Sequence, residues 1–355
     1  MSFFVAFLAF SALIVLHEAG HFFAAKAVGM RVEKFYLFFP PKLVGMKKGE
    51  TEYGVGMIPL GGFVKITGMN PDEELPPEVA ARGYYKQPVW KRIFVIGAGP
   101  AVNIILAFLI LWFLAFGIQQ PSQNIAEVAP ETPAAAKLLA GDRIISVDGV
   151  SGDQEAIANQ IASHRCAGEQ TDGCKATEPA EVVVMRDGER RAFEITPVYD
   201  AAAERSRLGF AFGYEDANPG PFEAARISAD YMWFVTSSTV SALSQLYKSE
   251  QREQLSGVVG SYEVTRQAVD VGAREALTLI ALISLSLGII NLFPFLPLDG
   301  GHIFWSVVEK IRGRPVPFAV MERAGLIGFA LVIGLFILGL NNDIGRLTGE
   351  GFNVR

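Results

Sequence analysis

Cysteine, histidine and charge are all scarce in this sequence. Its 355 residues include two cysteines and four histidines, and Asp, Glu, Lys and Arg together make up 19% of it. Two cysteines alone cannot form a structural zinc site, which takes four ligands. The net charge is −6 and there is no basic patch away from the apolar segments, which argues against a nucleic-acid partner.

Hydrophobic residues are abundant instead. They make up half of the chain, Phe occurs 26 times and the mean hydropathy is +0.30. This composition is typical of a polytopic membrane protein that carries a water-exposed part. A bilayer crossing takes about twenty apolar residues. We expect four such spans, the last one short, at residues 3–28, 93–118, 277–296 and 325–340.

Basic residues near the span ends predict the orientation. Residues 26–92 carry eleven Lys and Arg against seven Asp and Glu, and residues 310–323 form a short basic loop. Residues 119–274 carry fourteen basic residues against twenty-three acidic ones. Since short basic loops stay in the cytoplasm, we expect both loops there, with the middle segment and both termini outside. The first span lacks a basic start and a cleavage site, so we interpret it as retained rather than as a signal peptide.

The first span contains the motif His17-Glu18-Ala-Gly-His21. Two histidines four apart lie on one helix face, where both can bind one zinc ion, and the intervening Glu can act as general base. A chance match would leave three polar groups among apolar residues without a purpose, at a high cost. Ionisable groups inside a span usually mark function, so we interpret this as a metal site.

The third span ends in a second polar motif, which runs from Asn291 to His302. Pro294 and Pro297 must break the helix there. If spans one and three run in the same direction, Asp299 lies at the depth of the histidines and can be a third ligand, which leaves a fourth position for water. Asp299 could instead cap the following helix. His302 could compete as a ligand, although we prefer a supporting role for it.

Residues 52–66 alternate around Gly61 and Gly62 and predict two short strands joined at a Gly-rich turn. The stretch is apolar for a cytoplasmic loop, so it can dip into the membrane edge near the metal. An exposed strand edge there could pair with an extended peptide. An ordinary surface hairpin fits the same pattern.

The middle segment predicts one compact domain at residues 123–198. Strands are expected near residues 125 and 143, a short helix at 133–139, and a hairpin around Asp187-Gly188. Cys166 and Cys174 could form a disulfide or remain free thiols. Beyond it, residues 199–274 predict a helical connector without a fifth span, because charged residues interrupt the apolar pattern.

Taken together, these motifs resemble the site-2 protease family of intramembrane zinc metalloproteases (peptidase family M50), in its bacterial RseP-like branch. Four stretches match the family's motifs, and residues 126–149 resemble the core of a PDZ domain. The stretches are His17-Glu18-Ala-Gly-His21, Asn291 to Gly301, Pro59-Leu-Gly-Gly-Phe-Val-Lys65 and Gly99-Pro-Ala-Val-Asn103.

The resemblance implies an α-helical polytopic membrane protein of four transmembrane helices, with a membrane-associated β-hairpin and one extracytoplasmic α+β PDZ-like domain. The expected parts are an N-terminal membrane part (1–118, hairpin loop 50–68), the PDZ-like domain (123–198), an extracytoplasmic connector (199–274) and a C-terminal membrane part (275–355). It also implies one zinc ion per chain, held by His17, His21 and Asp299, with Glu18 as catalytic base. Substrate would bind at Asn291, Gly61, Gly62 and Phe63.

The implied substrates are single-span membrane proteins, either anti-sigma factors or remnants of signal peptides. The implied location is the bacterial cytoplasmic membrane, with the chain a monomer in the lipid bilayer. Two other functions are compatible with the motifs. One is an inactive membrane scaffold that presents a PDZ domain, and the other is a metal transporter, which would need polar groups in further spans.

Overall fold

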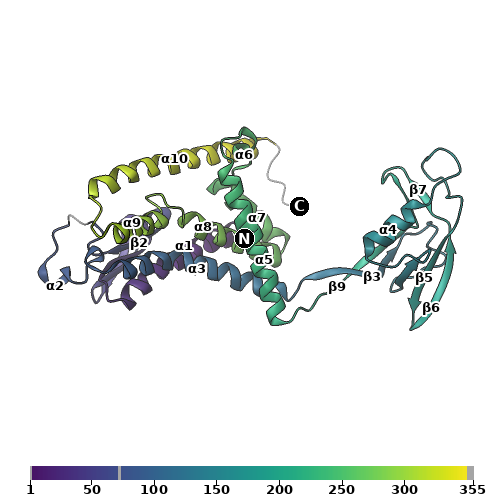
Figure 1. Cartoon of the computed structure of the whole chain (residues 1–355), viewed down its shortest axis with the longest axis horizontal. Coiled ribbons are helices and arrows are strands. Elements are labelled where there is room, and N and C mark those ends of the chain that lie inside the picture. The colour runs from purple at the N-terminus through teal and green to yellow at the C-terminus, as the bar shows by residue number, and fades with distance from the viewer. Residues whose placement is uncertain (1, 71–72, 350–355) are drawn as a thin grey trace. The chain divides into compact units, whose positions relative to one another are not determined.

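The computed structural model describes residues 2–70 and 73–349, and the chain divides into two compact units (Figure 1). The helical unit comprises residues 1–115 and 221–355, and the sheet unit comprises residues 116–220. In the sequence, the sheet unit therefore lies between the second membrane-length helix and the later helices of the helical unit.

Four helices of the described chain are long and apolar enough to cross a membrane, as predicted. They are α1 (Ser2–Ala27), α3 (Val89–Ala115), α8 (Ala273–Asn291) and α10 (Phe318–Thr348). The bounds of the last two differ from the prediction. Helix α10 has 31 residues, because polar residues at both ends lower the hydropathy without ending the helix. Helix α8 ends at Asn291 rather than at residue 296, since the two prolines that follow cannot continue it.

Small residues bring these helices into close contact. A Cβ on Gly20 of α1 would lie 2.6 Å from the carbonyl oxygen of Ala98 in α3, and one on Gly288 of α8 would lie 3.1 Å from that of Pro100. Only glycine permits such an approach of backbones, which is a common way to pack helices in membranes. Helix α3 therefore lies directly against both α1 and α8.

Residues 221–274 of the expected connector are helical, as predicted, and belong to the helical unit, whereas residues 199–220 belong to the sheet unit. The helical part forms α5 (Pro221–Ser244), α6 (Ser249–Gln254) and α7 (Val258–Val271). Met232 and Val235 of α5 pack on the cluster of Ala107 and Leu285 from α3 and α8. Helix α7 contacts α1, α8 and α10. After α8, an irregular segment leads into α9 (Asp299–Arg312), which contacts α3.

The hairpin is longer than predicted and is folded differently. Its strands are β1 (Val32–Lys48) and β2 (Thr51–Ile66), with the turn at Gly49-Glu50 rather than at Gly61-Gly62. Residues 34–37 of β1 pair with 62–65 of β2 and also with 52–55 of β2. The two halves of β2 therefore lie on either side of residues 34–37 of β1 and do not pair with each other. Residues 62–65 form an outer strand of this small sheet, and we call them the outer row.

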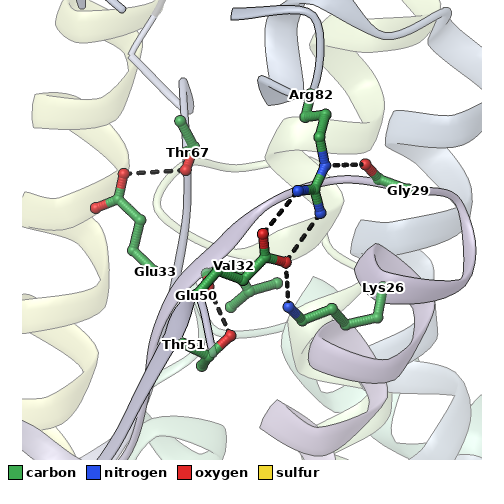
Figure 2. A network of polar contacts seen from close by, with 8 residues as sticks. All are labelled: Lys26, Gly29, Val32, Glu33, Glu50, Thr51, Thr67 and Arg82. Carbon is green, nitrogen blue, oxygen red and sulfur yellow. Dashed lines mark hydrogen bonds and ion pairs between the residues drawn. The ribbon is translucent and has the colours of Figure 1, made fainter. Parts of the chain in front are cut away.

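Salt bridges attach the hairpin turn to the C-terminal end of α1 (Figure 2). Glu50 accepts two hydrogen bonds from Arg82, at 2.6 and 2.9 Å, and pairs with Lys26 of α1. Arg82 follows the short helix α2 (Pro77–Ala80) and donates to the carbonyl of Gly29 at 3.1 Å. The 3₁₀ turn η1 (Tyr84–Lys86) then leads into α3.

The sheet unit is an antiparallel five-stranded sheet of order β6-β5-β4-β3-β9 with one helix, α4 (Gln154–Ser163). Ile157 and Ile161 of α4 contribute to its apolar core. The strands of this sheet are β3 (Gln119–Val128), β4 (Arg143–Val147), β5 (Ala180–Arg186), β6 (Glu189–Ile195) and β9 (Phe210–Asp216). Strands β7 (Val198–Asp200) and β8 (Arg205–Arg207) pair with each other in a separate two-stranded sheet.

Three features of this unit differ from the prediction or decide between its alternatives. The expected helix at 133–139 is a series of turns, and α4 was missed. The unit extends beyond residue 198, because β9 pairs with β3. Cys166 and Cys174 form a disulfide. The α+β composition is as expected, and the likeness to a PDZ domain stays a prediction.

Candidate metal centre

Two histidines of α1 and one aspartate of α9 point at a common centre. The Nε2 atoms of His17 and His21 lie 3.2 Å apart, and each lies 3.2 to 3.3 Å from Oδ2 of Asp299. Both histidines are buried, with exposed fractions of 8% and 7%. The fold thus joins, inside the helical unit, side chains that are far apart in the sequence.

The spacing of these three atoms fits a metal ion. Ligands about 2.0 to 2.1 Å from a tetrahedral zinc are about 3.3 Å from one another, which is the separation observed. Oδ2 of Asp299 is also buried without a well-oriented hydrogen bond among the described residues. A buried carboxylate oxygen without such a bond is costly unless another charge compensates it. The donor set of two imidazoles and one carboxylate is that of a catalytic site with one open position.

Asp299 does not cap its helix. The N-cap of α9 is Leu298, and no side chain caps the first turn. Asp299 is the first helical residue, and its carboxylate turns to the histidines. Gly300 and Gly301 allow this position, since a Cβ on Gly300 would lie 2.1 Å from the carbonyl oxygen of Leu292. The capping alternative is therefore wrong.

Helix α3 holds the other side of both imidazole rings. Nδ1 of His21 lies 2.9 Å from the carbonyl oxygen of Val95, which can only accept, so Nδ1 carries the hydrogen and Nε2 presents its lone pair to the centre. Nδ1 of His17 lies 3.4 Å from the side-chain amide of Asn103. The sequence alone did not indicate this contact of Asn103 with the site.

Gly99 of α3 is a second residue that the sequence analysis missed. A Cβ at this position would lie 2.3 Å from Nε2 of His21. The space that a side chain would fill is therefore the space that the imidazole uses. The sequence offered one signal, since Gly99 opens the stretch Gly99-Pro-Ala-Val-Asn103 that matches a family motif.

Glu18 is half-buried and faces the hairpin. A Cβ on Gly62 would lie 2.2 Å from Cγ of Glu18, so the backbone of β2 lies directly against this side chain. Phe63 stacks on the hairpin, with its ring centroid 6.1 Å from that of Tyr36 and 6.0 Å from that of Phe39. Gly61 bends the strand beside Phe39, at φ +154°. Gly62 is thus a hairpin residue in contact with Glu18.

Asn291 and His302 lie outside the ligand group. Asn291, at the end of α8, donates its amide hydrogen to the carbonyl of Leu287 at 3.0 Å. His302 follows Asp299 by one helical turn, and its ring is absent from the described group of converging ligand atoms.

A buried ion pair fixes α9, and with it Asp299, to α3. Arg92 is 2% exposed and donates to both carboxylate oxygens of Glu309, at 2.9 and 2.6 Å. Such two-pronged pairing also sets the orientation of the two helices.

Comparison with known proteins covers nearly the whole chain. The sequence profile of peptidase family M50 matches residues 5–335. A protein of Rhizobium meliloti is 31% identical over 95% of this chain and 94% of its own length, and one of Clostridium perfringens is 30% identical over 96% and 97%. Both are named as inferred zinc metalloproteases. Zinc metalloprotease Rip1 of Mycobacterium tuberculosis is 29% identical over 93% and 94%.

Proposed function

The chain belongs to peptidase family M50, and from this membership we propose that it is an intramembrane zinc metalloendopeptidase of the site-2 type. It hydrolyses peptide bonds within the transmembrane segments of other proteins. The observation that carries the proposal is the convergence of His17, His21 and Asp299 beside Glu18, within a bundle of membrane-length helices.

The cofactor is zinc, one ion per chain, held by His17, His21 and Asp299. The bound ion supplies Lewis acidity, which polarises the scissile carbonyl and makes water a nucleophile near pH 7. Glu18 takes the proton of the attacking water and delivers it to the leaving amine. Gly62 lies against Glu18 on the hairpin side. Because glycine has no side chain, it leaves the room that the side chain of Glu18 occupies.

The substrate binds along the outer row of the hairpin. Residues 62–65 pair with β1 on one side, which leaves their other edge for an extended peptide. A cavity of about 510 Å³ lies beside this edge, lined by Phe63, Val64, Lys65, Ile66, Met69, Asn70 and Glu73. A transmembrane helix must unwind before its amides are accessible, and strand pairing replaces the helical hydrogen bonds it gives up. Asn291 would hold the peptide backbone from the end of α8.

The proposed substrates are single-span membrane proteins of the anti-sigma-factor or signal-peptide-remnant type. The protein would act as a monomer in the bacterial cytoplasmic membrane, with the hairpin inside and the sheet unit and both termini outside. The disulfide between Cys166 and Cys174 supports an outer location for the sheet unit, because disulfides persist in oxidising compartments. An inactive scaffold would have no use for three converging ligand atoms, and nothing favours that alternative.

The direct test compares the purified protein with Glu18→Gln and His21→Ala on a single-span substrate in detergent. We expect one zinc per chain in the wild type and in Glu18→Gln, with cleavage in Glu18→Gln lower by a factor of at least about 10². His21→Ala should lose both zinc and cleavage. A wild type without stoichiometric zinc, or a Glu18→Gln variant with normal cleavage, would contradict the proposal.

A further inference from the structure

We propose that Asn103 is a positioning residue for the metal centre: its side-chain oxygen accepts the Nδ1 hydrogen of His17 and so turns the Nε2 lone pair of that ring to the metal. This inference rests on the proposed zinc site and deepens it.

Asn103 is a fully buried polar side chain in the middle of a membrane-length helix, with an exposed fraction of 0%. Its amide lies 3.4 Å from Nδ1 of His17, and Oδ1 is buried without a hydrogen-bond partner among the described residues. An amide in this setting is costly unless its groups are paired. Pairing with the imidazole is therefore its expected purpose.

The chemistry of the ring decides which amide atom must face it. A histidine that binds a metal through Nε2 is neutral and carries its hydrogen on Nδ1. That hydrogen needs an acceptor. The side-chain amide of Asn103 lies 3.4 Å away, and its Oδ1 has no other partner in the described part of the chain. A half-turn about the last side-chain bond exchanges the amide oxygen and nitrogen almost isosterically. In the exchanged orientation, Oδ1 of Asn103 accepts the hydrogen on Nδ1 of His17, so that both groups gain a partner.

The backbone around Asn103 is fixed by α8. Ser284 donates to the carbonyl oxygen of Asn103 at 2.9 Å, and both residues are fully buried. A Cβ on Gly288 would lie 3.5 Å from Cβ of Asn103, so α8 packs against the base of this side chain. The amide thus has a rigid support on the side away from the imidazole.

The two ligand histidines are supported in different ways. His21 uses the backbone carbonyl of Val95, which no substitution removes. His17 uses a side chain, so its support can be changed without altering a metal ligand. Such outer hydrogen bonds orient ligands and typically change metal affinity by a factor of about 10 to 100.

The test measures Zn²⁺ affinity of the full-length protein in detergent, by competition with a chromogenic chelator. Asn103→Leu removes the acceptor at similar volume, and Asn103→Asp keeps an acceptor but no donor. Ser284→Ala is the matched control, since it removes the neighbouring buried hydrogen bond without touching the imidazole. We expect Asn103→Leu to bind zinc about 10 to 100 times more weakly, and Asn103→Asp and Ser284→Ala to stay within about fivefold of wild type.

A second readout is independent of proteolysis and uses Co²⁺ in place of zinc. Asn103→Leu should alter the visible absorption of the bound cobalt, because the His17 ring is free to turn, and Ser284→Ala should leave it unchanged. Should Asn103→Leu fail to fold, Asn103→Asp decides alone: a loss of affinity beyond fivefold overturns the assignment. Equal affinity of Asn103→Leu and wild type also overturns it. If the wild type itself binds no zinc, the proposed function fails instead.

Discussion

Single glycines decide whether the metal centre can exist. Gly99 and Gly62 carry no chemistry of their own, yet each occupies a position where one methyl group would overlap a functional side chain. The first would meet His21 and the second Glu18. Substitutions at the two positions should therefore affect different functions, metal binding at Gly99 and proton transfer at Gly62.

Gly99→Ala should abolish metal binding. Its Cβ would lie 2.3 Å from Nε2 of His21, far inside van der Waals contact, and the ring must move out of the ligand position. We expect bound zinc to fall at least about tenfold, measured by elemental analysis of the purified protein. Gly97→Ala is the control one half-turn away, because its nearest neighbour is a side-chain atom of Ile303 at 3.9 Å. Equal zinc loss in both would show that the effect comes from helix packing.

Gly62→Ala should keep zinc and lose cleavage. The new methyl group meets Cγ of Glu18 at 2.2 Å and leaves the three ligands untouched. Displacing a general base costs about 10²-fold or more in rate, which a single-turnover cleavage assay measures beside zinc analysis. Gly334→Ala in α10 has open space around it and should cleave normally. Normal cleavage by Gly62→Ala would mean that Glu18 is not the base.

At the scale of elements, α9 carries Asp299 and depends on one ion pair. Glu309→Gln leaves Arg92 buried beside a neutral partner, and breaking a buried pair typically costs about 3 to 5 kcal/mol. We expect the thermal midpoint of unfolding to fall by several degrees and zinc occupancy to fall with it. The exposed neighbour Lys310→Gln should change neither quantity. An unchanged midpoint would show that α9 is held by other contacts.

The hairpin turn should loosen in acid. Hydrogen bonds from Arg82, and then from Lys26, lower the pKa of Glu50 to about 2 from its usual 4.5. A lowered folded-state pKa means that the stabilisation is complete above about 4.5 and is lost as the pH falls toward 2. The protection factors of residues 44–56 against hydrogen exchange, which compare each rate with that of an unfolded chain at the same pH, should therefore fall between pH 5 and pH 3, and Glu50→Gln should show low protection at both pH values. The same rate for wild type and variant at pH 5 would contradict this.

The sequence predicted some elements well and others poorly, for physical reasons. Apolar runs are strong signals, so all four spans were found. Helix α4 was missed because only Ile157 and Ile161 face the core, which is too few for a visible period. The turn and the strand pairing of the hairpin were predicted wrongly, because nothing in the local sequence indicates that a strand has partners on both sides. The ligands followed from motifs, whereas Asn103 and Gly99 acquire their roles only through the packing of α3 on α1.

At the scale of the whole molecule, cysteine labelling measures the orientation in the membrane. We expect Glu189→Cys in the sheet unit to react with a membrane-impermeant maleimide on intact bacterial spheroplasts, and Lys48→Cys near the hairpin turn to react only after permeabilisation. Both positions are exposed, and the native cysteines are paired. Reaction of Lys48→Cys from outside would reverse the proposed topology.

Asp343 is a buried carboxylate of the helical unit whose contacts serve packing rather than ion conduction. Asp343 of α10 is fully buried, and it accepts hydrogen bonds from the backbone of Gly257 and Gly260 at the start of α7. This carboxylate therefore anchors one helix to another. A metal transporter would need such groups in line with the ligands, and the contacts of Asp343 give no support to that alternative.

The order of the ligands along the chain sets when the enzyme can first act. His17 and His21 belong to the first helix, and Asp299 follows His21 by 278 positions. At a translation rate of about 5 to 20 residues per second, the third ligand follows the second by roughly 15 to 60 s. During this interval a nascent chain has both histidines but not the complete set of ligands. Its hydrolytic power can begin only after Asp299 has been synthesised.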